Sequence, residues 1–130
     1  MNTKLIMTST AILLGTIGLS LTFAPDKVMI LLGINSSVII SLILQLLGAA
    51  YFAFAMLNWM AKGAIIGGIY NRPIAIANLA HFLTGGLALT KVVISNHQLS
   101  VILSIMAGSF IICAIIFGII ISRHPLKTAA

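Results

Sequence analysis

The sequence predicts an all-α integral membrane protein: a bundle of four transmembrane helices with a short amphipathic interfacial helix after the first. Composition is one reason, because 61% of the 130 residues are hydrophobic and only 6% are charged, whereas soluble domains carry about 25% charged residues. Length is the other. Four apolar runs, at residues 5–23, 38–60, 74–94 and 99–122, are each about 20 residues long, enough for a helix to cross a hydrocarbon core of roughly 30 Å.

Helices are expected rather than barrel strands in these four runs. Backbone groups in lipid have no water to bond, so a spanning segment is either a helix or part of a closed barrel. Barrel strands would alternate polar and apolar residues, and these runs do not. We therefore expect a single domain, residues 1–130, with four spanning helices.

The first run begins like a signal peptide. Lys4 precedes the apolar core, and small residues at 22–24 resemble a cleavage site. However, Pro25 follows immediately, and a proline after the cut makes a poor substrate for the peptidase. The run is also long for a signal sequence. We therefore expect a retained helix.

The next segment, PDKVMILLGI at residues 25–34, is too short to cross a membrane and too apolar for a solvated loop. Pro25 suits the first turn of a helix, and Asp26 suits the positive end of the helix dipole. Gly33 suits the far end. We expect a short helix in the outer interface, with an irregular loop pressed against the bundle as the alternative.

The second run carries a stripe of polar and small residues. Its members recur at steps of three and four residues and so share one helix face; they are Gln45, Gly48, Tyr51 or Phe52, Ala55, and Asn58 or Trp59. Trp59, near the end of the run, is expected to be an interfacial anchor.

The third run follows Asn71, Arg72 and Pro73, in which Asn71 or Arg72 is expected to cap a helix and Pro73 to lie in its first turn. Asn78 and His81 then share a face of the helix.

The fourth run has Ser100, Ser104 and Gly108 at four-residue spacing. Small residues at this spacing let helix backbones approach closely in lipid. We therefore expect this strip to lie against another helix.

The charges predict the orientation. With four crossings, both termini and the loop at residues 61–73 share one side, which holds five basic residues: Lys4, Lys62, Arg72, Arg123 and Lys127. The other side holds Lys27, Lys91 and the only acid, Asp26. The positive-inside rule then predicts both termini in the cytoplasm. The net charge of +6 is an orientation signal and an attraction to anionic membrane lipids, and without a compact basic patch with interleaved aromatics we expect no nucleic acid partner.

A candidate site follows from the depth of the polar residues. The second and third runs are consecutive and antiparallel, joined on the predicted cytoplasmic side. Tyr51 and Asn58 of the second run can therefore face Asn78 and His81 of the third. Arg72, just before the third run, is expected at the interface, facing lipid phosphate.

Polar side chains within lipid point inward and are functional candidates by default. We therefore take these five residues as candidates for binding a lipid-like or quinone-like small molecule. Two alternatives stay open: hydrogen bonds that only fix helix contacts, worth about 0.6 kcal/mol each, and a proton-coupled path.

Several kinds of active site lack the residues they need. A metal site requires clustered ligands, but His81, His97 and His124 lie at different depths, which also argues against a bis-histidine haem. Asp26, the only acid, is predicted on the opposite surface from His81, so no serine–histidine–acid triad forms. Cys113 is the only cysteine, so neither a disulfide nor a thiol pair is expected. We expect no cofactor and do not favour an enzyme.

The stretches APDKVMILLGI (24–34) and GGIYNRPIAIANLAHFLTGGLAL (67–89), within four apolar runs, resemble small DoxX-like bacterial membrane proteins. This resemblance implies a four-helix bundle of the bacterial inner membrane. Better-known relatives are membrane subunits of oxidoreductase complexes, although this chain has no redox ligands that would support that role directly.

Three functions remain after this reading. The first is a binding or accessory protein with a polar pocket between the second and third runs, as a homo-oligomer or with a membrane partner protein. The second is a purely structural partner subunit. The third is a small transporter or channel built by oligomerisation.

Overall fold

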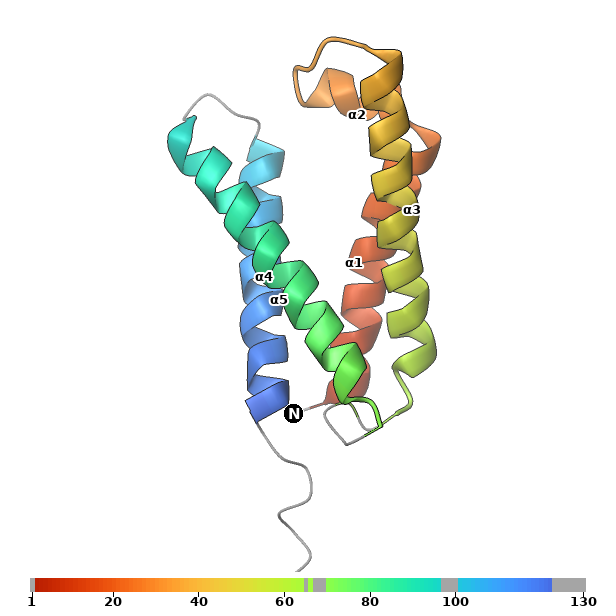
Figure 1. The fold of residues 1–130 in the computed structure, drawn as a ribbon, viewed down its shortest axis with the longest axis vertical. Coiled ribbons are helices and arrows are strands. Elements are labelled where there is room, and N and C mark those ends of the chain that lie inside the picture. Colours follow the sequence, from red (N-terminus) through yellow and green to blue (C-terminus); the bar gives the residue numbers. More distant parts are fainter. Residues whose placement is uncertain (1, 65, 67–69, 97–100, 123–130) are drawn as a thin grey trace, which may run out of the picture. The chain divides into compact units, whose positions relative to one another are not determined.

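The computed structural model describes residues 2–64, 66, 70–96 and 101–122, and its regular elements there are all α-helices (Figure 1). They are, in chain order, α1 (Thr3–Phe23), α2 (Pro25–Leu31), α3 (Val38–Ala61), α4 (Arg72–Ser95) and α5 (Val101–Ser122). All except α2 are long and apolar enough to cross a membrane. The all-helical class, the four apolar helices and the short helix after the first are therefore confirmed, with differences only at the helix ends.

The chain divides into two compact units, Met1–Gly63 and Ala64–Ala130. The first unit contains α1, α2 and α3, and we call it the first hairpin. The second contains α4 and α5, and we call it the second hairpin. The single four-helix domain expected from the sequence stays a prediction.

Small residues hold α1 against α3. A Cβ atom added to Gly18 would lie 2.8 Å from the carbonyl oxygen of Gly48, and a Cβ added to Gly48 would lie 2.8 Å from that of Gly18. A Cβ added to Gly15 would lie 3.6 Å from the Cβ of Ala55, so residue numbers rise along one helix as they fall along the other. Because packing rather than hydrophobicity joins helices in lipid, this close antiparallel contact is the main attraction within the hairpin.

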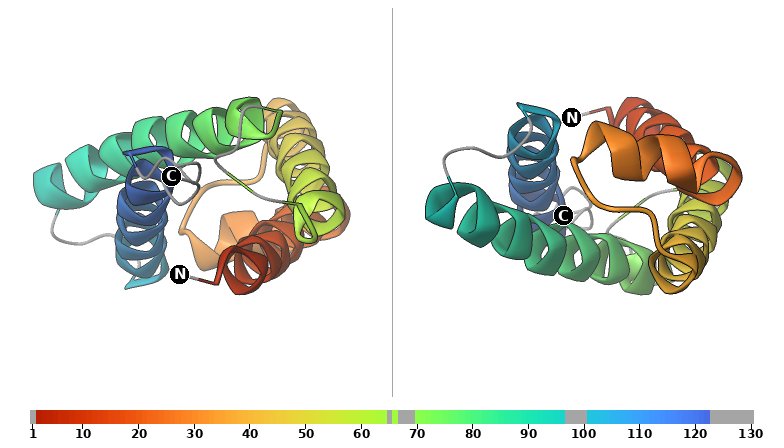
Figure 2. Two further views of the ribbon diagram at one scale, coloured as in Figure 1. Left: turned by 90° about the horizontal axis from the view of Figure 1, so that it is seen from below. Right: turned by 90° about the horizontal axis from the view of Figure 1, so that it is seen from above.

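The helix α2 contacts both α1 and α3 and lies across the end of the pair (Figure 2). The geometry at the C-terminal end of α2 explains why a glycine occupies position 33. The N–H of Gly33 donates to the carbonyl oxygen of Ile30 at 3.1 Å, and that of Ile34 donates to Met29 at 2.9 Å, which is the bond pair of a Schellman motif. Gly33 has φ +69°, the only positive φ in the described ranges, and glycine adopts it without a Cβ clash.

Aromatic rings form the core of the second hairpin. The rings of Phe82 and Phe117 are stacked, with centroids 5.8 Å apart, and Phe82 meets Phe110 edge-on at 5.2 Å. All three side chains are fully buried. Gly86 makes room beside them, because a Cβ there would lie 2.9 Å from the Cδ1 of Ile111. Pairs of this kind contribute about 0.5–1.5 kcal/mol beyond their buried area.

Within the second hairpin, the strip predicted on α5 does not face α4, and its contact with any other helix stays a prediction. Ser104 and Gly108 are exposed, and a Cβ on Gly108 would have no atom within 4 Å, while Ser100 lies outside the described residues. The face that α5 buries instead carries Ala107, Phe110, Ala114, Phe117 and Ile120. The large rings fill the interface with α4, so the small residues turn away from it.

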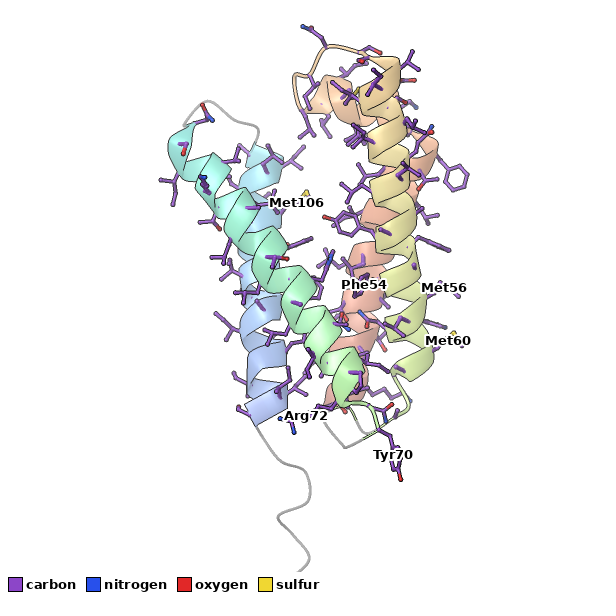
Figure 3. All side chains as sticks on the ribbon, in the orientation of Figure 1. Phe54, Met56, Met60, Tyr70, Arg72 and Met106 are labelled. Carbon is purple, nitrogen blue, oxygen red and sulfur yellow. The ribbon has the colours of Figure 1, made fainter. Side chains whose placement is uncertain are left out.

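Large apolar side chains cover the outer surfaces of the long helices. Met56 and Met60 project outward from α3 (Figure 3), where they are 45% and 78% exposed. Leu5 on α1 and Val101 on α5 are likewise exposed, at 64% and 71%. Soluble monomers rarely show large apolar surfaces, whereas lipid accommodates them, in line with spanning helices.

Candidate functional site

The five predicted site residues belong to two different units. Tyr51 and Asn58 lie on α3 in the first hairpin, and Arg72, Asn78 and His81 lie on α4 in the second. Their meeting in one pocket stays a prediction. Each group has surroundings of its own.

Asn58 bonds across the first hairpin. The side chain is fully buried, and its amide Nδ2 donates to the hydroxyl oxygen of Thr10 on α1 at 3.3 Å. Thr10 is 3% exposed, and its hydroxyl donates in turn to the carbonyl oxygens of Ile6 at 2.9 Å and Met7 at 3.1 Å. This chain of bonds ties the α3 amide to the α1 backbone and fixes the register of the two helices.

Sequence reasoning missed Thr10 as the partner of Asn58. A signal was present, because Thr10, Leu14, Gly18 and Leu21 recur at steps of three and four residues, and all four are buried. The depth of the polar residues pointed to α4 as the partner of α3 instead, and this face of α1 was not recognised.

Tyr51 is 8% exposed and lies on the buried row of α3 with Gly48, Ala55 and Asn58. The predicted stripe is confirmed for these four residues. Gln45 is exposed, so the buried row begins at Gly48, where the backbones of α1 and α3 come closest.

Asn78 is fully buried on α4. Its Nδ2 donates to the carbonyl oxygen of Ile74, one turn earlier in the same helix, at 2.9 Å. A buried amide donor needs a partner because burying it unbonded costs free energy, and here its own helix provides one.

His81 belongs to the aromatic cluster of the second hairpin. Its ring centroid lies 5.3 Å from that of Phe82, at 72°, and 5.6 Å from that of Phe110, at 48°. The imidazole is partly exposed beside these buried rings. It combines a polar ring with an apolar wall, which is the composition that pockets for apolar ligands with one polar group use.

Arg72 is the first residue of α4 and is exposed, and Tyr70 just before it is 94% exposed (Figure 3). A cation and an amphipathic ring at the end of a spanning helix are typical of the membrane–water interface. The position fits the predicted anchor at lipid phosphate.

A cation–π contact at the end of α3 was not predicted. The Nζ of Lys62 lies 3.1 Å from the centroid of the Trp59 ring, within the range in which the ring quadrupole attracts a cation. Trp59 is about half exposed, as expected for an interfacial anchor. The three-residue spacing was the available signal, because such neighbours meet on a helix surface.

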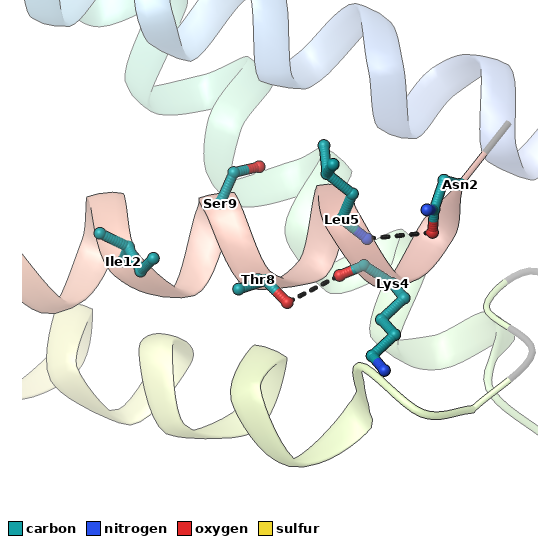
Figure 4. Close-up of a pocket in the computed structure, with 6 residues that line it drawn as sticks. All are labelled: Asn2, Lys4, Leu5, Thr8, Ser9 and Ile12. Carbon is teal, nitrogen blue, oxygen red and sulfur yellow. Dashed lines mark hydrogen bonds between the residues drawn. The ribbon is translucent and has the colours of Figure 1, made fainter.

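An open hollow runs along the first turns of α1, lined by Asn2, Lys4, Leu5, Thr8, Ser9 and Ile12 (Figure 4). Its polar side chains mostly serve the helix itself. The Asn2 oxygen accepts from the N–H of Leu5 at 3.3 Å, and the hydroxyl of Thr8 donates to the carbonyl of Lys4 at 2.8 Å. What the hollow offers a ligand is therefore chiefly apolar surface.

Within the described part of the chain, no three His, Cys, Asp or Glu side chains form a group that could hold a metal ion. The four apolar helices define the class of protein as a multi-pass, all-helical membrane protein. No protein-family model, curated protein or solved structure matches the chain. The resemblance to DoxX-like proteins stays a prediction.

Proposed function

We propose that this protein is a small accessory subunit of the bacterial inner membrane, which carries out no reaction itself and binds a partner protein in the same membrane. The use of its buried polar side chains carries the proposal. Asn58 bonds across the first hairpin to Thr10, and Asn78 bonds to Ile74 within α4. The Asn58 amide joins two helices and the Asn78 amide bonds within its own helix, whereas an enzyme or a transport path would aim such groups at a substrate.

The location and orientation belong to the same proposal. Both termini lie in the cytoplasm, because the side that they share carries five of the seven lysines and arginines. The bacterial inner membrane is the location that the DoxX-like resemblance implies.

Native mass spectrometry tests the accessory role. The tagged chain is purified in mild detergent from the membranes of its own host, beside an unrelated tagged four-helix membrane protein as control. We expect the 13.7 kDa chain together with a second, different polypeptide at a fixed ratio that the control does not retain. A monomer alone would contradict the proposal, and a complex of identical chains would favour the oligomeric transporter or channel.

A second candidate function is a pocket for a lipid-like or quinone-like molecule, and one observation favours it. His81 places a polar ring beside Phe82 and Phe110 within a spanning helix. A neutral imidazole offers one donor and one acceptor, which suits a quinone carbonyl or a lipid ester.

Thermal melting tests this second candidate. Wild type and His81→Gln are melted with and without a quinone and lipid extract of the inner membrane, with Thr84→Val, on an exposed position of α4, as the matched control. A bound ligand raises the melting temperature of wild type and of Thr84→Val, and His81→Gln loses the rise. If no protein responds, the pocket is abandoned and the accessory role is unaffected.

A further inference from the structure

Two lysines lie at the same end of the first hairpin. The bond between Thr10 and Asn58 fixes the antiparallel register of α1 and α3. From that bond, Lys4 lies about 9 Å along α1 and Lys62 about 6 Å along α3, and both displacements point the same way. We call this region, comprising Lys4, Trp59 and Lys62, the lysine end of the first hairpin.

The side chain of Lys62 starts from the face of α3 that packs on α1. Lys62 is the residue that caps α3 and keeps helical backbone angles, φ −59° and ψ −22°. It follows Ala55 and Gly48 at one and two heptads, so it continues their row. Lys4 projects from the first turn of α1 on the opposite side from Ser9 (Figure 4) and is exposed.

No carboxylate side chain of this protein can neutralise the two ammonium groups. Asp26 is the only acidic residue of the chain, and it stands at the start of α2, beyond the far end of α1. The length of α1 separates it from Lys4 by roughly 30 Å. The counter-charge has to come from outside the hairpin.

The surroundings of the lysines match the level of lipid headgroups. The Trp59 ring holds the Lys62 ammonium 3.1 Å from its centroid, and indole rings settle at the membrane–water interface. Leu5 and Met60 lie beside the lysines along the chain and are 64% and 78% exposed. A small ion from solution would leave this apolar surface uncovered, whereas the acyl chains of a lipid cover it.

The geometry points to a binding site for the phosphate group of an anionic phospholipid at the lysine end of the first hairpin. Lys4 and Lys62 contact the phosphate, Trp59 positions Lys62, and the acyl chains lie along Leu5 and Met60. This assignment is independent of the accessory role, since it requires no partner protein.

Lipid titration followed by native mass spectrometry tests the site. The full chain in mild detergent is titrated with phosphatidylglycerol and with phosphatidylcholine of the same acyl chains. We expect wild type to bind phosphatidylglycerol more tightly than phosphatidylcholine. Since each lysine near an anionic headgroup contributes roughly a fivefold gain in affinity, the double variant Lys4→Gln/Lys62→Gln should bind it about 25-fold more weakly. Trp59→Leu, which keeps both charges, should weaken binding less.

The matched control is Lys27→Gln/Lys91→Gln, which removes the same charge from the opposite helix ends and should bind phosphatidylglycerol as wild type does. Circular dichroism melting verifies that each variant is folded. Equal losses in the two double variants would overturn the site, because they would show attraction to net charge alone. Displacement of the lipid by an equal concentration of inorganic phosphate would also overturn it, because the site would then prefer a free anion.

Discussion

At the scale of single residues, polar side chains buried in an apolar protein are recognisable from sequence, but their partners are not. Tyr51, Asn58 and Asn78 were predicted to face inward, and all three are buried. The partner of Asn58 depends on the rotation of α1 about its own axis. Pairing between α3 and α4 was inferred from depth alone, and depth does not fix which faces meet.

A double-mutant cycle tests the bond between Asn58 and Thr10. Thr10→Val and Asn58→Leu each remove one partner while keeping a similar volume. We expect a coupling energy of about 0.6 kcal/mol and at most about 1.7 kcal/mol, the range found for hydrogen bonds between spanning helices. Unfolding in mixed detergent micelles gives the free energy of unfolding of wild type, the two single variants and the double variant. A coupling energy of zero would mean that the bond does not stabilise the contact between α1 and α3.

At the scale of helices, periodicity and turn chemistry predicted the elements well. Pro25 and Gly33 predicted the start and end of α2, and the backbone angle of Gly33 gives the reason. The small strip on α5 does not face α4, because small residues permit close contact without requiring it. The α4–α5 interface is formed instead by rings such as Phe82 and Phe117, whose volume decides which face is buried.

Two glycine substitutions distinguish a glycine in a helix contact from one on an exposed face. Gly48→Ala places a Cβ 2.8 Å from backbone atoms of α1, so the helices must move apart, and overpacking of this kind costs roughly 1–3 kcal/mol. Gly108→Ala meets no atom within 4 Å and, because alanine is the better helix former, should leave stability unchanged or raise it by up to about 1 kcal/mol. Melting curves in one detergent compare the two variants, and an equal effect would contradict the assigned interface.

A neighbouring pair on α4 tests the aromatic core. Phe82 is fully buried and Leu83 is 42% exposed. Phe82→Ala should destabilise the protein by about 3 kcal/mol, at the lower end for buried phenylalanine. Leu83→Ala should destabilise it far less, because the Leu83 side chain is partly exposed and makes fewer contacts within the hairpin. Chemical unfolding measures the free energy of unfolding of both variants. A larger loss of stability from Leu83→Ala than from Phe82→Ala would contradict the assigned core of the second hairpin.

At the scale of the whole molecule, composition and run length predicted the class, because lipid restricts a spanning chain to very few structures. Function was less predictable than class, because a functional site depends on which faces of the helices contact one another. The orientation in the membrane is less predictable than the class and more predictable than the function, because it rests on the distribution of basic residues such as Lys4 and Lys62.

Cysteine labelling in intact spheroplasts tests the central claim, a protein with four crossings and both termini in the cytoplasm. In a Cys113→Ala background, single cysteines replace Asn2, Asn35 or Asn96, and a membrane-impermeant maleimide is added from outside. We expect labelling at positions 35 and 96, which two spans separate, and labelling at position 2 only after the membrane is permeabilised. Labelling at position 2 alone would reverse the orientation, and labelling of positions 2 and 96 together would contradict the four crossings.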